Sequence, residues 1–325
     1  MSNESHKSQN DFAKVDMHAH FIPQAYKEAF DVYLGGKNPD RFPMPDSSEQ
    51  KTLEFLDEMN IARQVIGLSS PHINMDSPAV NKKIARACNE EMALLAHDHP
   101  GRLSFLASLS VPYVEDAIDE AVYSLDALRA VGITLPTNSK GIYMSDPSLE
   151  PLFEVLDERA TMVVFHPNRP GSVPTGVGQK LPEPIIEFFF DTTRLVADLI
   201  LKGYVERYPN IKFVVPHCGA ALPVVFDRMA LYASTLKEQG QIPGDFDVYR
   251  TASKLYYDLA GNSMPSQLKI LLGYVPEDHF VYGSDYPFTA MSGVAYLAQS
   301  IADCDYLSDE QKRHMFYDNG QALLA

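Results

Sequence analysis

Short apolar runs recur along the chain, with amphipathic segments between them. Two of these segments begin with a capping residue followed by proline, Ser77-Pro78 and Asp146-Pro147, which is typical of a helix start. A third, Glu115–Ala130, repeats apolar residues at helical spacing. The pattern predicts helices that alternate with eight buried strands: Phe12–Met17, Gln64–Ser69, Leu103–Leu109, Gly132–Pro136, Thr161–Phe165, Ile211–Pro216, Lys254–Leu259 and His279–Gly283.

Strands that are apolar along their whole length are typical of parallel sheets covered by helices. Eight of them predict a distorted (β/α)8 barrel and one domain over residues 1–325, with residues 1–11 as a flexible tail. A doubly wound open sheet is the alternative, although no G-x-G-x-x-G follows the first strand. Two long Pro- and Gly-rich segments, Phe21–Gln50 and Pro167–Glu187, follow the first and fifth strands. We expect them to be loops over the C-terminal mouth of the barrel, where active sites are built.

Composition narrows the class of partner. The 325 residues include 27 Lys and Arg against 43 Asp and Glu, a net charge of −16 that disfavours nucleic acid and anionic membranes. No apolar run reaches the ~20 residues that a membrane span needs, and the polar N-terminus is unlike a secretory signal. The three cysteines are too few for a disulfide framework. We therefore expect a cytoplasmic protein that acts on a small molecule, with any positive charge for an anionic ligand supplied locally.

The histidines indicate where the chemistry lies. His18 and His20 form H-x-H at the end of the first strand, and alternate strand residues point to the same side. His166 ends the fifth strand, His217 follows the sixth, and Asp285 follows the eighth. In a closed barrel these five side chains converge on one rim. Imidazole and carboxylate ligands suit zinc, and also manganese, iron or cobalt.

Other polar residues have simpler interpretations. A second H-x-H, His97-Asp98-His99, ends a helix just before the third strand, which places it at the opposite end of a barrel from the site. His72 follows the second strand and could reach the pocket, so it is a candidate substrate contact. Cys218, next to His217, is predicted to be a buried structural thiol because adjacent strand residues face opposite ways.

With these residues in place, the sequence resembles the amidohydrolase superfamily. The matching pieces are DMHAH after the first strand, VFHP at His166, PHCGAALP at His217 and GSDYPF at Asp285. The run FDTTRLVADLILKGYVERYPNIKFVVPHCG resembles the branch that contains aminocarboxymuconate-semialdehyde, 6-methylsalicylate and γ-resorcylate decarboxylases. The resemblance covers the chain from about Val15 to Leu324.

The resemblance implies one divalent metal, zinc or alternatively manganese, held by His18, His20, His166 and Asp285. Dinuclear members of the superfamily carry a bridging Lys or Glu after the fourth strand. Here Thr137 and Asn138 occupy that place, which favours a single ion.

The activity implied is that of a carboxy-lyase, which releases carbon dioxide from a salicylate-type hydroxybenzoate or a related unsaturated acid without hydrolysis. Two schemes remain open. In one, Asp285 passes a proton to the ring carbon; in the other, metal-bound hydroxide attacks the substrate. His217 is a candidate general acid/base in both, because imidazole titrates near neutral pH. A hydrolase of a lactone, ester or amide that uses a metal-bound water is the alternative function, and a non-catalytic binding protein is a third.

Substrate contacts are expected from four further positions. Arg228 matches an arginine that some relatives use to hold a substrate carboxylate, sometimes across a dimer interface; its alternative is a surface ion pair. Phe189, Phe190 and Arg194 could wall the pocket near an aromatic ring, with buried packing as the alternative for the two phenylalanines. Asp191 is predicted to cap a helix that begins at Thr192. A homodimer is also implied by the family.

Overall fold

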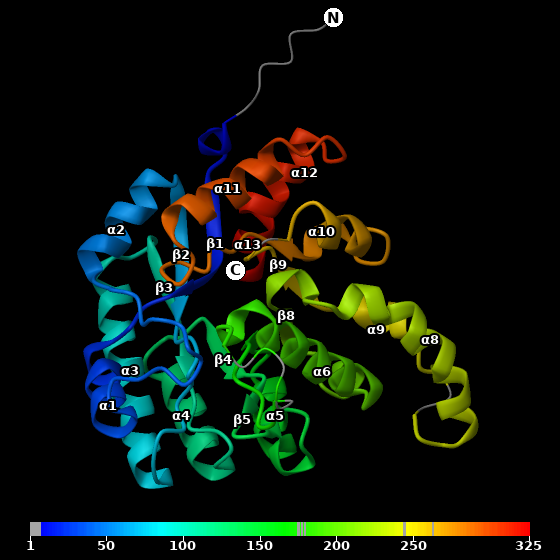
Figure 1. The fold of residues 1–325 in the computed structure, drawn as a ribbon, viewed down its shortest axis with the longest axis horizontal. Coiled ribbons are helices and arrows are strands. Elements are labelled where there is room, and N and C mark those ends of the chain that lie inside the picture. Colours follow the sequence, from blue (N-terminus) through cyan, green and yellow to red (C-terminus); the bar gives the residue numbers. More distant parts are fainter. Residues whose placement is uncertain (1–7, 174–175, 177, 179, 243–244, 262) are drawn as a thin grey trace, which may run out of the picture.

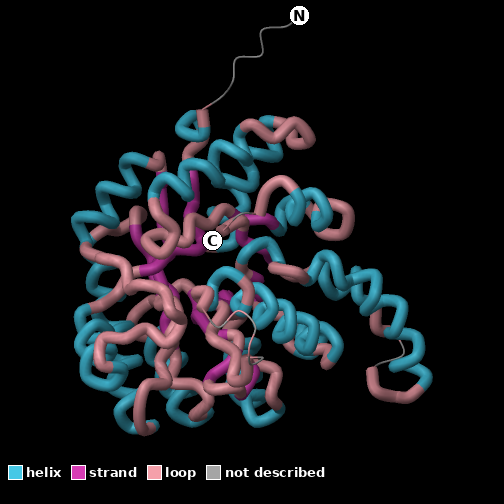
Figure 2. Tube along the Cα trace, in the orientation of Figure 1, coloured by secondary structure: helices cyan, strands magenta, loops and turns pink. Residues whose placement is uncertain are grey.

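The chain folds around one eight-stranded parallel sheet that curls into a nearly closed barrel (Figures 1 and 2). The computed structural model describes residues 8–173, 176, 178, 180–242, 245–261 and 263–325. The strands follow the order β1-β2-β3-β4-β7-β8-β9-β10, with bounds Lys14–His20, Ile61–Gly67, Leu103–Ser108, Gly132–Pro136, Met162–His166, Lys212–Val215, Tyr256–Asp258 and Phe280–Val281. The predicted (β/α)8 barrel is confirmed, because each predicted strand overlaps one of these eight.

The remaining two strands form a small antiparallel hairpin after β4, made of β5 (Asn138–Ser139) and β6 (Ile142–Tyr143). Helices cover the outside of the barrel (Figure 2). The α-helices are α1 (Gln24–Leu34), α2 (Glu49–Glu58), α3 (Pro78–Asp98), α4 (Val114–Asp126), α5 (Glu150–Glu158), α6 (Glu187–Leu201), α7 (Tyr204–Arg207), α8 (Leu222–Glu238), α9 (Val248–Ala252), α10 (Ser266–Leu271), α11 (Met291–Ala302), α12 (Asp309–Arg313) and α13 (Asn319–Leu323).

The two ends of the sheet meet where β1 lies beside the chain that follows β10. Met17 N donates to Tyr282 O at 2.9 Å, and Asp285 N donates to His18 O at 2.8 Å. A buried carboxylate, Asp16, reinforces this seam: it accepts hydrogen bonds from the backbone N (2.9 Å) and Oγ (2.6 Å) of Ser284. The seam brings the first and last strands of the chain together.

The barrel interior is filled with side chains. One buried apolar cluster takes residues from six different strands and from α13, so its members meet inside the barrel. A larger cluster lies between the strands and the surrounding helices. Because a packed barrel leaves no pore, ligands must bind at its end. The small cluster contains Val15, Met17, Val65, Leu106, Met162, Val164, Val214, Val281 and Leu323.

Several predicted boundaries shift. The helix expected over Glu115–Ala130 ends at Asp126, and Arg129 has a left-handed φ of 62° that is incompatible with helix. The flexible tail predicted for residues 1–11 is wrong at its end, because Gln9–Asp11 forms a 3-10 turn and Gln9 is buried; residues 1–7 lie outside the described residues. No helix in the described part of the chain combines the length and apolar character needed to cross a membrane.

Candidate metal centre

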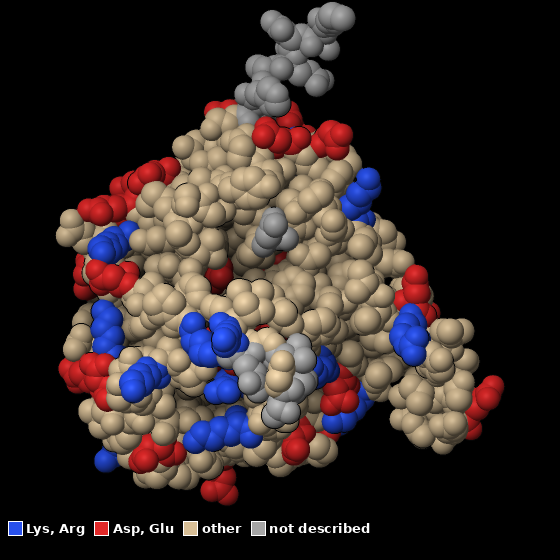
Figure 3. Space-filling view, viewed as in Figure 1, with Lys and Arg blue, Asp and Glu red and all other residues tan. Residues whose placement is uncertain are grey.

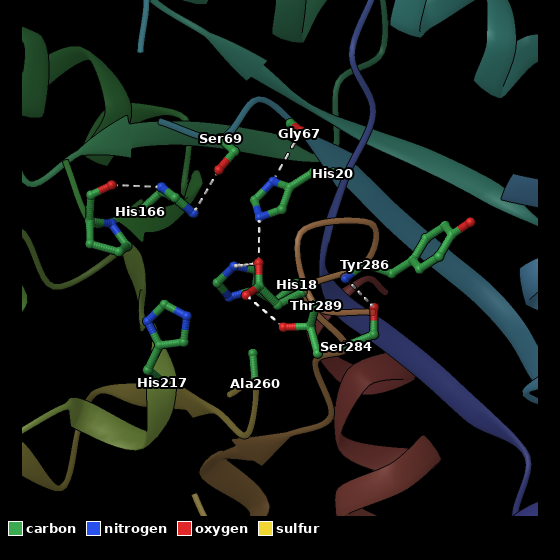
Figure 4. A network of polar contacts seen from close by, with 12 residues as sticks. His18, His20, Gly67, Ser69, His166, His217, Ala260, Ser284, Tyr286 and Thr289 are labelled. Carbon is green, nitrogen blue, oxygen red and sulfur yellow. Dashed lines mark hydrogen bonds and ion pairs between the residues drawn. The ribbon is translucent and has the colours of Figure 1, made fainter. Parts of the chain in front are cut away.

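Four side chains meet at the C-terminal end of the barrel. His18 and His20 lie on β1, His166 ends β7 and Asp285 follows β10. One ligand atom from each of the four lies within 4.8 Å of all the others. Figure 4 shows the imidazole rings of His18 and His20, from one strand, close to that of His166, from another. The four residues that the sequence proposes as metal ligands are therefore adjacent in space.

Local backbone geometry aims these side chains. The register of β1 against β2 shifts between Asp16 and Ala19, where the strand carries its first histidine. Asp285 has a left-handed φ of 57°, and its side chain is held by Thr289, whose Oγ1 donates to Oδ2 at 3.1 Å. Gly283 permits the close approach of the two chain segments, because a Cβ there would lie 2.7 Å from Cβ of His18.

In each of the three candidate histidine ligands, the outer ring nitrogen, Nδ1, has a partner that fixes the ring. His166 Nδ1 donates to Pro167 O at 2.8 Å, and His20 Nδ1 donates to Gly67 O at 3.3 Å. A carbonyl oxygen only accepts, so Nδ1 carries the proton in both rings and Nε2 keeps its lone pair. His18 Nδ1 lies 2.7 Å from Asp258 Oδ2. This arrangement of outer partners is typical of histidines that bind metal.

The inner nitrogens of His18 and His20 lack a hydrogen-bond donor among the described residues, whereas Nε2 of His166 lies 3.3 Å from the Ser69 hydroxyl. His18 Nε2 is buried without a hydrogen bond among the described residues. His20 Nε2, a lone pair in the neutral ring, faces Asp285 Oδ1 at 3.1 Å. Two electron-pair donors at this distance repel each other unless a cation lies against both. The chain's own residues thus fit a divalent ion bound by three imidazoles and one carboxylate.

The electrostatics favour a positive charge here. Burial lowers the pKa of His20, and it lowers the pKa of His166 far below its ordinary value, so both rings are neutral. For Asp285 burial raises the pKa, but the surrounding imidazoles, protonated His18 among them, outweigh it and hold the carboxyl ionised. For His18 burial lowers the pKa, but the negative charges of Asp258 and Asp285 raise it to about 9. The two carboxylates therefore stabilise a cation at His18.

His217 faces this cluster from a strained turn. Its φ is 54°, and Cys218, Gly219 and Ala220 also have positive φ values, of 52°, 76° and 53°. The ring centroid lies 5.1 Å from that of His18, and no hydrogen bond to the imidazole is found in the described part of the chain. Gln267 Nε2 supports the turn by donating to the carbonyl oxygens of His217 (3.0 Å) and Ala220 (2.8 Å). The turn presents an unengaged imidazole toward the cluster (Figure 4).

A cavity of about 250 Å³ opens above these residues. Its polar floor contains Ser69, His166, His217 and Asp285, and its walls are largely aromatic. Phe288 stands against the cluster, with its ring centroid 5.3 Å from that of His20. The volume lies just below the ~300–1,000 Å³ of drug-sized ligand sites, which suits a single aromatic ring. The aromatic lining consists of Phe42, Phe188, Phe189 and Phe288.

A clasp of three charged residues, Arg41, Arg169 and Glu183, joins the two long segments over the mouth. The Glu183 carboxylate is fully buried, and its Oε1 lies 2.7 Å from Nη2 of Arg41 and 3.3 Å from Nε of Arg169. The backbone N of Glu183 also donates to Asp40 O at 2.9 Å. Phe42 follows Arg41 in the chain and Pro184 follows Glu183, and both line the cavity. The Glu183 clasp therefore fixes part of the cavity wall.

Of the residues predicted to wall the pocket, Phe189 lines the cavity, whereas Phe190 and Arg194 lie farther out. Phe190 is 48% exposed, whereas Phe188 and Phe189 line the cavity, because α6 begins at Glu187 and turns Phe190 outward. The Arg194 side chain is 51% exposed and lies 3.9 Å from Asp191 Oδ1.

Arg228 lies on the exposed face of α8, with its guanidinium 5.4 Å from the ring centroid of Tyr232. It does not line the cavity within one chain. His72 is buried and lines a second, neighbouring cavity instead. His99 of the other H-x-H pairs with Glu49 at 2.8 Å, remote from the cluster in the chain's fold.

The capping role predicted for Asp191 is wrong. Because α6 begins at Glu187, Asp191 lies inside the helix, where its buried carboxylate accepts hydrogen bonds from Thr137, Asn138 and Tyr143. The residues that replace a bridging ligand after β4 therefore hold α6 against the barrel. Cys218 is buried, as predicted.

Sequence reasoning missed Asp258. This residue ends β9, is fully buried, and contacts both His18 and the backbone N of His217 (2.9 Å). Its signal was present, since an aspartate that closes the run KLYYDL occupies a strand end just as His166 does.

Comparisons with known proteins agree with this geometry. The family model described as Amidohydrolase matches residues 15–325. The decarboxylase yanB of Aspergillus niger is 32% identical over 95% of this chain and 87% of its own length. The 6-methylsalicylic acid decarboxylase of Penicillium expansum is 28% identical over 96% of this chain and 95% of its own.

Solved structures share the fold. One described as an amidohydrolase II has a TM-score of 0.91 and 38% identity, covering 96% of this chain and 99% of the other. The 5-carboxyvanillate decarboxylase of Novosphingobium aromaticivorans, solved with manganese and 4-hydroxy-3-methoxy-5-nitrobenzoic acid, has a TM-score of 0.86 and 18% identity. That alignment covers 100% of this chain and 99% of the neighbour.

Proposed function

This chain belongs to the amidohydrolase family, and we propose that it is a carboxy-lyase that releases carbon dioxide from a salicylate-type hydroxybenzoate. The curated relatives described above are decarboxylases, and one of them is named for 6-methylsalicylic acid. The observation that carries the proposal is a cluster of three histidines and an aspartate, two of whose members, His166 and Asp285, lie on the floor of a small aromatic cavity. An aromatic acid fits that combination of a charged floor and apolar walls.

We propose that His18, His20, His166 and Asp285 hold one divalent ion. Zinc and manganese both accept imidazole and carboxylate ligands, and a structural neighbour was solved with manganese. When bound, such an ion supplies Lewis acidity toward the carboxylate and the ortho hydroxyl of the substrate.

Side chains of the protein then supply the proton that decarboxylation requires. Decarboxylation replaces the C–CO2 bond by a C–H bond: a proton adds to the ring carbon, and the electrons of the broken C–C bond return to the ring as carbon dioxide leaves. Asp285 and His217 both line the cavity where that carbon would lie. We assign His217 as the general acid/base, because its ring is unengaged and burial lowers its pKa, which favours rapid proton exchange by a neutral imidazole. Asp285, ionised at rest, is the candidate that takes this proton from the protonated form of His217 and delivers it to carbon.

The aromatic walls orient the substrate. Phe42 and Phe288, whose ring centroids are 6.3 Å apart, come from segments after β1 and after β10. Rings in this position contact the flat face or edge of a bound arene and exclude water from the reacting carbon. Exclusion of water also disfavours hydrolytic chemistry in the same cavity.

We propose that the active form is a homodimer in which Arg228 reaches the partner's site. Val224, Arg228 and Leu231 share one face of α8 at helical spacing, and the two apolar side chains are 68% and 69% exposed. Exposed apolar side chains around an arginine are typical of a protein interface. Analytical ultracentrifugation of the Val224→Glu protein tests this assignment, since a dimer held by this face would dissociate.

The decisive test is carbon dioxide release by protein loaded with zinc or manganese, with a chelated sample as control. The panel is salicylate, 6-methylsalicylate and 2,6-dihydroxybenzoate, with 4-hydroxybenzoate as the acid that lacks an ortho hydroxyl. Metal-dependent release from at least one ortho-hydroxy acid is expected. If fully loaded protein released no carbon dioxide from any of them but hydrolysed lactones or esters, the lyase proposal would be wrong.

A further inference from the structure

A second cavity, of about 510 Å³, lies beside the first. Two chain segments form the wall between them. Ser69 and His166 face the first cavity, while His72 and Asn168, a few residues along each segment, face the second. The second cavity therefore has its own lining and shares no lining residue with the candidate metal centre.

Two buried polar side chains in this cavity lack partners. His72 is 5% exposed, and neither of its ring nitrogens has a hydrogen bond within the described residues. Asp40 is 2% exposed, and neither of its carboxylate oxygens has a partner at hydrogen-bonding geometry in the part of the chain that the structure describes, although the Ser70 side chain lies close enough to lower its pKa. Buried polar groups are nearly always paired, so an orphaned carboxylate and an orphaned imidazole in one cavity point to a missing hydrogen-bonding molecule.

The backbone around Asp40 holds its carboxylate in place. The backbone N of Asp40 donates to Oδ1 of Asn38 at 2.9 Å, and its backbone O accepts a hydrogen bond from Glu183 N. These two bonds fix the backbone at Asp40. A carboxylate offers only acceptors, and a neutral imidazole offers one donor and one acceptor. The inner end of the cavity is thus suited to a hydroxyl or ammonium group.

The outer part carries positive charge. Lys140 is exposed and the Arg169 side chain is 48% exposed, and both line the cavity. Figure 3 shows Lys and Arg side chains gathered on the face that carries the segment after β7, on a chain whose net charge is −16. Local positive charge on an acidic protein attracts a carboxylate or a similar anion. Leu34 and Met75 supply apolar contact between the two ends.

We propose that this cavity is a second ligand site, which takes a small organic acid with a hydroxyl or ammonium group at its far end. The acid group lies against Lys140 and Arg169, and the donor group reaches Asp40 and His72. Hydroxybenzoates with a para hydroxyl, aliphatic hydroxy acids and amino acids share this chemistry. The proposal goes beyond the decarboxylase assignment and does not depend on turnover.

The test uses 4-hydroxybenzoate, and glycine or 4-hydroxybutyrate as amine and aliphatic probes, with metal-loaded full-length protein. Crystals soaked in each probe locate it, and calorimetric titration gives its affinity. We expect density between Asp40 and Lys140 for at least one probe, and affinity about tenfold weaker in Lys140→Gln and Asp40→Asn proteins. Lys140→Arg should restore binding, whereas Lys83→Gln, the same charge change on an exposed lysine of α3, should leave it unchanged.

Two results would overturn the proposal. One is ordered water alone on Asp40 and His72 in crystals soaked with every probe. The other is binding only in the first cavity, with an affinity that neither Lys140→Gln nor Asp40→Asn alters. Neither result bears on carbon dioxide release, so the decarboxylase proposal is tested separately.

Discussion

Nδ1 of His18 lies 2.7 Å from Oδ2 of Asp258, a fully buried carboxylate on another strand. The other oxygen of that carboxylate accepts a hydrogen bond from the backbone N of His217 at 2.9 Å. One side chain therefore orients a candidate metal ligand and anchors the turn that carries the candidate acid/base. Four predictions follow from the geometry of the site and its surroundings.

Asp258→Asn should weaken metal binding while preserving the fold. The change keeps the shape of the side chain but removes the negative charge that orients His18, and losses of such outer partners typically cost ~10–100-fold in metal affinity. Metal content after dialysis against a buffered chelator measures the effect. Asp278→Asn, an exposed carboxylate in the turn before β10, is the matched control. Unchanged metal affinity in Asp258→Asn protein would contradict the assigned role.

His166→Ala and His217→Ala should separate metal binding from turnover. His166 contributes a ligand atom to the cluster, so its loss should lower metal occupancy. His217 lies outside that set of ligand atoms, so His217→Ala protein should keep its metal and lose turnover by ~100-fold or more. Elemental analysis and carbon dioxide release on the same samples give both readouts. Full activity of His217→Ala protein would remove this residue from the mechanism.

Glu183→Gln should raise KM by roughly tenfold and change kcat less. Without the negative charge, Arg41 and Arg169 no longer hold the two mouth segments together, and Phe42 loses its fixed position on the cavity wall. The control is Glu150→Gln, whose partner Arg207 lies 2.8 Å away on the surface.

A second readout for Glu183 needs no substrate. The chain contains no tryptophan, so Phe42→Trp provides a single indole probe. Its emission should shift to the red when Glu183→Gln is added, because the ring becomes more exposed to water. Identical emission in both backgrounds would show that the Glu183 clasp does not position this wall.

Asp40→Asn should change how stability depends on pH. Burial raises the pKa of Asp40 from 3.8 to about 6; Glu183 also raises it, while Ser70 and Arg169 lower it. The folded state therefore binds more protons than the unfolded state between these values, and the contribution of Asp40 to the free energy of unfolding falls as pH rises through this window. A shift of this size corresponds to at most about 3 kcal/mol.

We expect the free energy of unfolding of the Asp40→Asn protein to increase relative to that of the unchanged protein from about pH 4 to about pH 7. Urea unfolding of both proteins at each pH measures it, and the difference cancels pH effects that they share. A difference that is constant with pH would mean that the carboxyl titrates normally in the folded chain.

The sequence predicted the barrel, and predicted that the four candidate ligands lie together, because both depend on local patterns. Apolar runs mark the strands, and His18, His166 and Asp285 each stand at the end of such a run. The topology of a parallel barrel then brings all strand ends to one rim. Asp258 follows the same rule, because it ends β9.

Features that depend on tertiary contacts were not recoverable. The orientation of Phe190 required the first residue of α6, which lies five residues before the predicted start at Thr192. Moving a helix start by that much rotates every side chain relative to the cavity. The Glu183 clasp joins Arg41 to a residue 142 positions away, and no local pattern specifies such a pair.

The seam between β1 and the chain after β10 bears on the order in which the centre can assemble during synthesis. His18, His20 and His166 lie in the first half of the chain or just past it, but Asp285 emerges near its end. A nascent chain released after β7 would carry three of the four candidate ligands and no closed barrel. We therefore expect capture of the proposed ion to coincide with ring closure, and metal uptake by refolding protein would time that last step.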